Sequence, residues 1–209
     1  MVTGIMTDSG MQTFTDLKDG AILYTHSDHI GRKIQQTRDY YERDLLNELS
    51  RRMKKSGTFL DIGANIGNHS VYFARYLADK VISIEPNGNN FALLERNAAD
   101  LPIIAICGAC SDVAGMGHVQ DVSHNMGMCE LEPGNTVHVF RADALITEPV
   151  RLIKIDAEKS TGNALRGCEK LIYQYRPIIV IEGRSEWLES KGYWKIWSGC
   201  ATETFVYVF

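Results

Sequence analysis

The stretch TFLDIGANIGNHSVYFA, residues 58–74, constrains the fold more than any other part of this chain. Residues that suit a strand are followed by a carboxylate, two glycines and an asparagine, and then by apolar residues at helical spacing. Glycines between a strand and a helix allow a tight turn and a close approach of the backbone to a ligand. The stretch therefore predicts a strand, a turn and a helix, with a ligand at the turn.

The same alternation of strand and helix patterns extends over most of the chain. Apolar residues recur at helical spacing over 40–55, and strand and helix patterns alternate as far as residue 109. Residues 111–150 are irregular and predict loops with a hairpin, before the alternation returns with a strand, a helix over 161–175 and another strand. This alternation predicts an α/β fold with a mostly parallel, doubly wound sheet. The tail at 203–209 predicts an antiparallel C-terminal edge strand.

Length and composition limit the class of protein. A chain of 209 residues suffices for one full core, so we expect a single domain over 39–209, preceded by an N-terminal extension, 1–38, on the substrate side. No apolar run approaches the roughly 20 residues that span a bilayer, which predicts a cytoplasmic protein without a membrane partner. The net charge of −4 gives no basic surface for nucleic acid.

Cysteines and histidines show no metal-binding pattern. The five cysteines are odd in number and widely spaced, which predicts free thiols. Cys107 and Cys110 form a C-x-x-C in what we interpret as a buried strand, and no second pair completes a zinc site. We expect no metal. His69 is predicted to pack or cap the helix after the glycine turn, whereas His29 and His124 lie in loop-like stretches where either could take a proton.

Acidic residues end most of the predicted strands. In doubly wound sheets, ligands bind beyond the carboxyl ends of the strands, where the strand order reverses. The residues found there are Asp61, Glu85, Asp156 with Glu158, and Glu182.

The carboxylate that opens the first turn indicates the kind of ligand. It would repel the pyrophosphate of a dinucleotide, and the usual G-x-G-x-x-G is absent. S-adenosylmethionine carries a sulfonium and an ammonium instead, so Asp61 can pair with its cationic end while Gly63 and Gly67 let the backbone approach. Glu85 ends the next strand, where an acid can bind the hydroxyls of a ribose.

Four segments together resemble a known family. FLDIGANIGNHSVYFA, VISIEPNGNNFALLERNAA, LIKIDAE and RPIIVIEG closely resemble the FkbM-type methyltransferases, and the resemblance covers about residues 41–183. It implies a Rossmann-like class I methyltransferase fold and an S-adenosylmethionine-dependent O-methyltransferase. It also implies that the acceptor is a hydroxyl of a sugar or glycan, a polyketide or another small secondary metabolite.

The resemblance also implies roles for single residues. The methionine end of the cofactor would lie against Asp61, Gly63, Asn65 and Gly67, the ribose against Glu85 with Pro86 beside it, and the adenine against Ser111 and Asp112. The YYE at 40–42 resembles a family feature and brings Glu42 toward the cofactor or the acceptor.

One segment departs from the family pattern. Where the family usually reads KIDVEG followed two residues later by another acid, this chain has Lys159 in place of the glycine and Thr161 in place of the acid. Asp156 and Glu158 remain. Residues two apart in an extended segment point the same way, so both carboxylates could face one acceptor hydroxyl. We predict that Asp156 and Glu158 are catalytic, as candidate general bases, and that Asp156 also contacts the cofactor.

Other functions remain as alternatives to an O-methyltransferase. A catalytically silent protein that binds S-adenosylmethionine is compatible with Lys159 and Thr161. An NAD-dependent oxidoreductase is disfavoured by the acidic turn. Nucleic-acid methylation is a weaker alternative, because the chain has no basic stripe, no Pro-Cys nucleophile and no Asn/Asp-Pro-Pro-aromatic motif.

Overall fold

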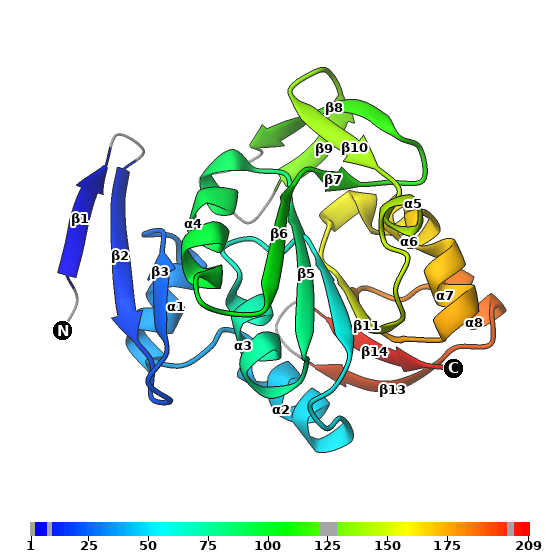
Figure 1. Ribbon diagram of the computed structural model, residues 1–209, viewed down its shortest axis with the longest axis horizontal. Coiled ribbons are helices and arrows are strands. Elements are labelled where there is room, and N and C mark those ends of the chain that lie inside the picture. The colour runs from blue at the N-terminus through cyan, green and yellow to red at the C-terminus, as the bar shows by residue number, and fades with distance from the viewer. Residues whose placement is uncertain (1–2, 8–9, 122–128, 200–202) are drawn as a thin grey trace.

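The computed structural model describes residues 3–7, 10–121, 129–199 and 203–209 (Figure 1). At its centre is a seven-stranded sheet in the order β13-β14-β12-β11-β4-β5-β6. Five neighbouring strands of this sheet run parallel: β4 (Thr58–Ile62), β5 (Lys80–Glu85), β6 (Ile103–Cys107), β11 (Val150–Ile155) and β12 (Ile178–Glu182). The strand order reverses between β4 and β11, which places the expected ligand site at their carboxyl ends.

The edges of the sheet differ from the sequence prediction in two details. The predicted antiparallel C-terminal strand is β14 (Thr204–Val208), but β13 (Trp194–Gly199) pairs with its outer side and occupies the edge. At the other edge, β6 is only partly buried and Cys107 is exposed, because no other strand in the described part of the chain pairs with its outer side. Cys107, Cys110 and Cys168 are free thiols, as predicted.

Helices cover both faces of the sheet and create two hydrophobic cores. One face is packed by α2 (Arg43–Arg52), α3 (Asn68–Tyr76) and α4 (Gly88–Ala98), and also by α1 (His29–Thr37). On the other face lie α5 (Ala142–Leu145), α6 (Thr161–Gly167), α7 (Glu169–Tyr175) and α8 (Glu186–Ser190). The predicted helix over 161–175 is divided at Cys168. The strands between the cores are almost continuously buried, as expected for parallel strands covered on both sides.

The N-terminal segment forms a small antiparallel sheet beside α4 (Figure 1). Its strands are β1 (Thr3–Thr7), β2 (Gly10–Asp16) and β3 (Ile22–Thr25). The backbone N–H of Tyr24 donates to Asn97 Oδ1 of α4 at 2.7 Å. Leu23 and Ile34 are fully buried in the same core as α2 and α3. The segment over 1–38 therefore has its own sheet but shares its core with the rest of the chain.

A second small sheet follows β6 and lies near the carboxyl ends of β5 and β6. It has the order β7-β10-β8-β9, with β7 (Ala109–Cys110), β8 (Gly115–Asp121), β9 (Cys129–Pro133) and β10 (Val137–Phe140). The predicted hairpin corresponds to the antiparallel pair of β8 and β9. His124, one of the predicted proton acceptors, lies outside the described residues. Among those that are described, no helix combines the length and the apolar character needed to cross a bilayer.

Candidate active site

The glycine turn between β4 and α3 is held close to the end of β11. Gly63 has φ 72°, and a Cβ there would lie 1.8 Å from the backbone oxygen of Asp156. The Gly63 N–H donates to Ile84 O at 2.9 Å, and the Asp156 N–H donates to Ile62 O at 2.9 Å. Only glycine fits this corner, because both the conformation and the space exclude a side chain.

Two cavities lie beside this turn and share part of their lining. The first is lined by Gly63, Asn65, Glu85, Pro86, Asn90, Gly108, Ala109, Cys110, Val119, Asp156, Ala157, Glu158 and Ser160, together with Ile62 and Ile84. The second has a volume of about 380 Å³ and is lined by His29, Ile30, Tyr41, Glu42, Gly63, Ala64, Asn65, Ile66, Asn68, His69, Lys154, Asp156, Glu158 and Glu182. The shared lining is Gly63, Asn65, Asp156 and Glu158.

Glu85 is the principal charged group on the first cavity's β5 side. Its carboxylate accepts the backbone N–H of Asn65 at 2.8 Å and that of Asn87 at 2.9 Å, and only 4% of the residue is exposed. Burial raises the pKa of Glu85 to about 7, although these N–H donors oppose the shift. A buried carboxylate held by two backbone donors is well placed to accept hydrogen bonds from hydroxyls of a ligand.

Asp61 lies beneath the turn rather than on a cavity wall. It is fully buried, accepts the hydroxyl of Ser70 at 2.6 Å and lies 3.5 Å from Lys154 Nζ. Lys154 in turn contacts Asp156 at 3.3 Å. Burial alone would lower the pKa of Lys154, but the carboxylates of Asp156 and Asp61 raise it overall. Asp61 thus pairs with a cation of the protein itself, whereas we expected it to pair with the cationic end of the cofactor.

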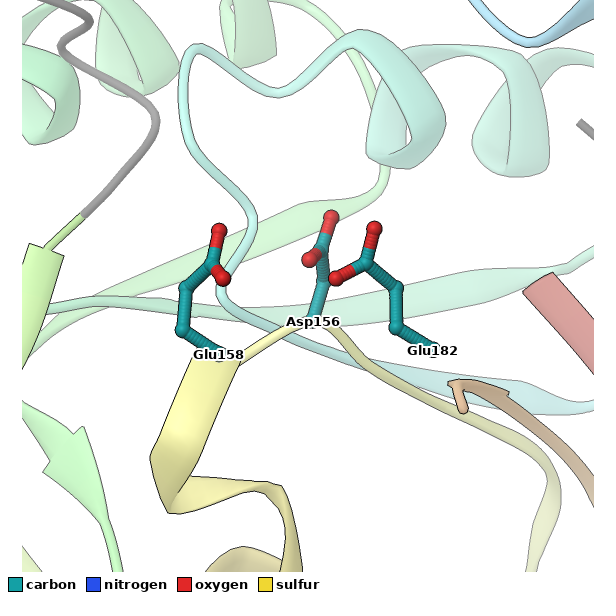
Figure 2. Close-up of side chains that lie close together, drawn as sticks. All are labelled: Asp156, Glu158 and Glu182. Atoms are coloured by element: carbon teal, nitrogen blue, oxygen red, sulfur yellow. The ribbon is translucent and has the colours of Figure 1, made fainter. Parts of the chain in front are cut away.

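Three carboxylates meet where β11 and β12 end (Figure 2). Asp156 follows β11, Glu158 begins a 3-10 turn, and Glu182 ends β12; carboxylate oxygens of the three lie within 4.8 Å of one another. Figure 2 shows the three side chains extending toward the same side. Like charges this close favour a cationic ligand, either organic or metallic. The absence of a metal stays a prediction.

His69 and Glu42 meet on the α2 and α3 side of the second cavity. His69 Nε2 lies 3.2 Å from Glu42 Oε2, and both side chains are less than 10% exposed. Glu42 lines the cavity, and its place near the cofactor or the acceptor, which the resemblance implied, stays a prediction. His69 was expected only to pack or cap; it does pack against Phe73, but it also lines the cavity. No spacing in the sequence links it to Glu42, since the pair forms only when the two helices pack together.

Strained backbone is concentrated around the second cavity. Seven described residues other than glycine have a positive φ, and three of them line this cavity: Glu42 (54°), Asn65 (52°) and Glu158 (49°). Such conformations cost free energy and persist where the surrounding structure enforces them, often at functional sites.

Several other predicted residues lie away from the cavities. Ser111 is buried, with its N–H bonded to Phe140 O, and Asp112 pairs with Arg166 at 3.0 Å. The first cavity is lined by 108–110 instead, because β7 carries the chain past it. Gly67 ends the turn with φ 84° and packs against Leu94 rather than lining either cavity. His29 does line the second cavity.

The two departures from the family pattern also lie away from both cavity walls. Lys159 is exposed, and the hydroxyl of Thr161 donates to Glu158 O at 2.9 Å at the start of α6. Neither residue belongs to the lining of the two cavities.

The sequence model of the Methyltransferase FkbM domain matches residues 61–193. This chain belongs to the FkbM methyltransferase family. Membership confirms the predicted class, an S-adenosylmethionine-dependent methyltransferase, and the predicted cofactor, and it sets aside the alternative of an NAD-dependent oxidoreductase.

Solved structures similar to this FkbM-family chain support the same fold. The methyltransferase FkbM from Methylobacillus flagellatus KT is 20% identical with a TM-score of 0.54, over 74% of this chain and 44% of that one. The precorrin-6y C5,15-methyltransferase from Geobacter metallireducens GS-15 is 10% identical with a TM-score of 0.51, over 80% and 87%. The chain thus spans less than half of the Methylobacillus protein. No curated protein sequence matches it significantly.

Proposed function

We propose that this FkbM-family domain is an O-methyltransferase that methylates a hydroxyl of a small polar molecule, such as a sugar or glycan or a secondary metabolite. The observation that carries the proposal is the wall shared by the two cavities, formed by Gly63, Asn65, Asp156 and Glu158. A cofactor whose nucleoside occupies the first cavity can reach past this wall toward an acceptor in the second. The methyl group would then lie where the two cavities meet.

The first cavity suits the nucleoside of the cofactor. Glu85, with Pro86 beside it, would accept hydrogen bonds from the ribose hydroxyls, and the adenine would lie against residues 108–110 rather than Ser111 and Asp112. The methionine end would follow Gly63 and Asn65. Asp61 would act indirectly, by fixing Lys154 and, through Ser70, the first turn of α3.

The second cavity suits an acceptor with several hydroxyls. Its volume of about 380 Å³ is in the range of small-molecule sites, and its lining is rich in carboxylates, amides and imidazoles. We assign Asp156 and Glu158 as catalytic carboxylates that contact the acceptor hydroxyl, orient it in line with the methyl group and face the sulfonium. Part of this lining, at 29–30 and 41–42, comes from or adjoins the N-terminal segment, which supports its proposed place on the substrate side.

The acidic lining argues against a nucleic-acid acceptor, because phosphates would be repelled by it and the chain carries a net charge of −4. A cytoplasmic location stays a prediction.

Binding and turnover test the proposal separately. Calorimetry should show that S-adenosylmethionine and S-adenosylhomocysteine bind and that NAD binds much more weakly. Isotopically labelled S-adenosylmethionine should then label at least one acceptor in a panel of monosaccharides, glycosides and polyols. Tighter binding of NAD would refute the cofactor assignment. Cofactor binding without transfer to any acceptor would favour the silent binding protein instead.

A further inference from the structure

His69 has a buried ring nitrogen that the packing of α3 leaves without a hydrogen bond to any described residue. It lies in the first turn of α3, 6% exposed, on the wall of the second cavity. Among the described residues, no hydrogen bond engages Nε2, and its polar neighbour is Glu42 Oε2 at 3.2 Å, without hydrogen-bond alignment. A buried ring nitrogen without a hydrogen bond is costly, unless a ligand or a small rearrangement satisfies it.

The carboxylate of Glu42 is held where it can orient this imidazole. Glu42 has φ 54° at the start of α2, a conformation that costs free energy for a residue with a side chain. A small rotation would bring the Nε2–H onto Oε2, and catalytic hydrogen bonds are often long or misaligned before substrate binds. An imidazole that donates from Nε2 keeps the lone pair on Nδ1 available.

The carboxylates of the acidic group are less suited to receive a proton. Asp156 Oδ2 already lies 3.3 Å from Lys154 Nζ, so its charge is partly compensated by a buried cation. Asp156, Glu158 and Glu182 also lie within 4.8 Å of one another, where their negative charges complement the sulfonium. His69 does not belong to this group and lies against Glu42, and the charged or titratable lining is completed by Tyr41, Lys154 from β11 and His29 from α1.

We propose that His69 takes the proton of the acceptor hydroxyl and that Glu42 is its positioning residue. This inference rests on the proposed methyltransferase function. The acceptor O–H bond breaks and its proton goes to Nδ1 of His69. The oxygen lone pair forms the bond to the methyl carbon, the S–CH₃ bond breaks, and its electron pair stays on sulfur, giving S-adenosylhomocysteine. The carboxylate of Glu42 stabilises the imidazolium.

The first test needs no acceptor. In protein labelled with ¹⁵N-histidine, two-dimensional NMR at pH 8 distinguishes the ring tautomers, and the His69 signals are those lost in His69→Gln. We expect His69 to be protonated on Nε2 and unprotonated on Nδ1. Protonation on Nδ1 would overturn the proposal, whatever acceptor the protein uses.

The second test measures transfer and binding together, with the acceptor found in the panel of sugars and polyols. His69→Gln should lower turnover by about 10²–10⁴-fold, the usual scale for a general base, and leave the dissociation constant of S-adenosylmethionine within about threefold. Glu42→Gln should lower turnover less. The matched control is His118→Gln, because His118 is exposed in β8 and bonds Thr136 outside the cavity. It should change neither quantity.

Loss of cofactor affinity in His69→Gln, in parallel with turnover, would mean that His69 holds the cofactor, and it would overturn the proposal. A second variant, His69→Ala, separates loss of the proton acceptor from loss of the fold. Added imidazole should restore part of its turnover. If the variant is folded and binds cofactor but imidazole restores nothing, His69 is not the proton acceptor. If the wild type labels no acceptor at all, the proposed function fails, and the tautomer measurement still decides the state of His69.

Discussion

The two cavities differ in how the chain builds them. Ten of the fifteen described residues that line the first lie between Ile62 and Cys110, and the other five are Val119 and four residues of the stretch 156–160. The second is assembled from five separated stretches, at 29–30, 41–42, 63–69, 154–158 and 182. One continuous stretch of chain therefore forms most of the cofactor side, whereas the acceptor side depends more on packing between distant segments.

The cavities also differ in charge. Of the described residues, the second cavity collects four carboxylates around one lysine, whereas the first adds only Glu85 to the two carboxylates that both share. A neutral nucleoside needs few charges, whereas a sulfonium and a polar acceptor are stabilised by many. If this division is correct, substitutions on the two sides should separate binding from turnover.

The strongest test of the division is at the shared carboxylates. Asp156→Asn and Glu158→Gln should each lower turnover by about 10²–10³-fold, because the acceptor hydroxyl loses its orientation in line with the methyl group. Affinity for S-adenosylmethionine, measured by calorimetry, should stay within a few fold. Glu148→Gln, in a surface pair with Lys80, is the control and should leave both unchanged. A large loss of affinity with normal turnover would reverse the assignment.

Substitution of Lys154 tests whether the carboxylates around it depend on this buried cation for stability. Lys154→Met should lower the free energy of unfolding by about 3–5 kcal/mol, because Asp61 is left buried without its ion partner. Urea denaturation provides the measurement. Lys80→Met breaks a half-exposed pair at 2.7 Å and should cost at most about 1 kcal/mol. Equal effects in the two variants would contradict the importance of the buried pair.

Glu85 tests the cofactor side. Glu85→Ala should weaken S-adenosylmethionine binding by about 1.5–3 kcal/mol, the range for hydrogen bonds to a charged group. Glu95→Ala, at an exposed position on α4, is the matched control. An unchanged dissociation constant in folded Glu85→Ala would mean that another group binds the ribose.

The raised pKa of Glu85 makes cofactor binding depend on pH. Ribose hydroxyls donate to the ionised carboxylate, so binding favours deprotonation and should strengthen as pH rises through about 7. Affinity should be about fivefold weaker at pH 6 than at pH 7, with proton release detectable in buffers of different ionisation enthalpy. The difference should vanish in Glu85→Gln; its persistence there would point to another titrating group.

The smallest effect is expected at Lys159. The Lys159→Gly change removes an exposed side chain that lines neither cavity, so affinity and turnover should both stay within about twofold. Higher turnover would show that the lysine obstructs the acceptor after all, and lower turnover would show a working ion pair with a catalytic carboxylate.

The sequence predicted what depends on local chain geometry. The turn at Gly63 and the acid at Glu85 follow from neighbouring residues in one unit, and the alternation of elements predicted the parallel sheet. Pairings between distant residues could not be read this way: Lys154 with Asp61, and His69 with Glu42, depend on strand register and helix packing. The placement of Ser111 depended on β7, a two-residue strand too short to leave a pattern.

The corner formed by Gly63 and the Asp156 carbonyl also bears on laboratory evolution of this domain. Because not even a methyl group fits there, position 63 tolerates no other residue, and a library that randomises it would consist mainly of misfolded members. Of the two cavities beside the glycine turn, positions 29, 30 and 41 line only the second. Substitutions at these three positions would change the part of the cavity that we assign to the acceptor and would leave the turn at Gly63 unchanged.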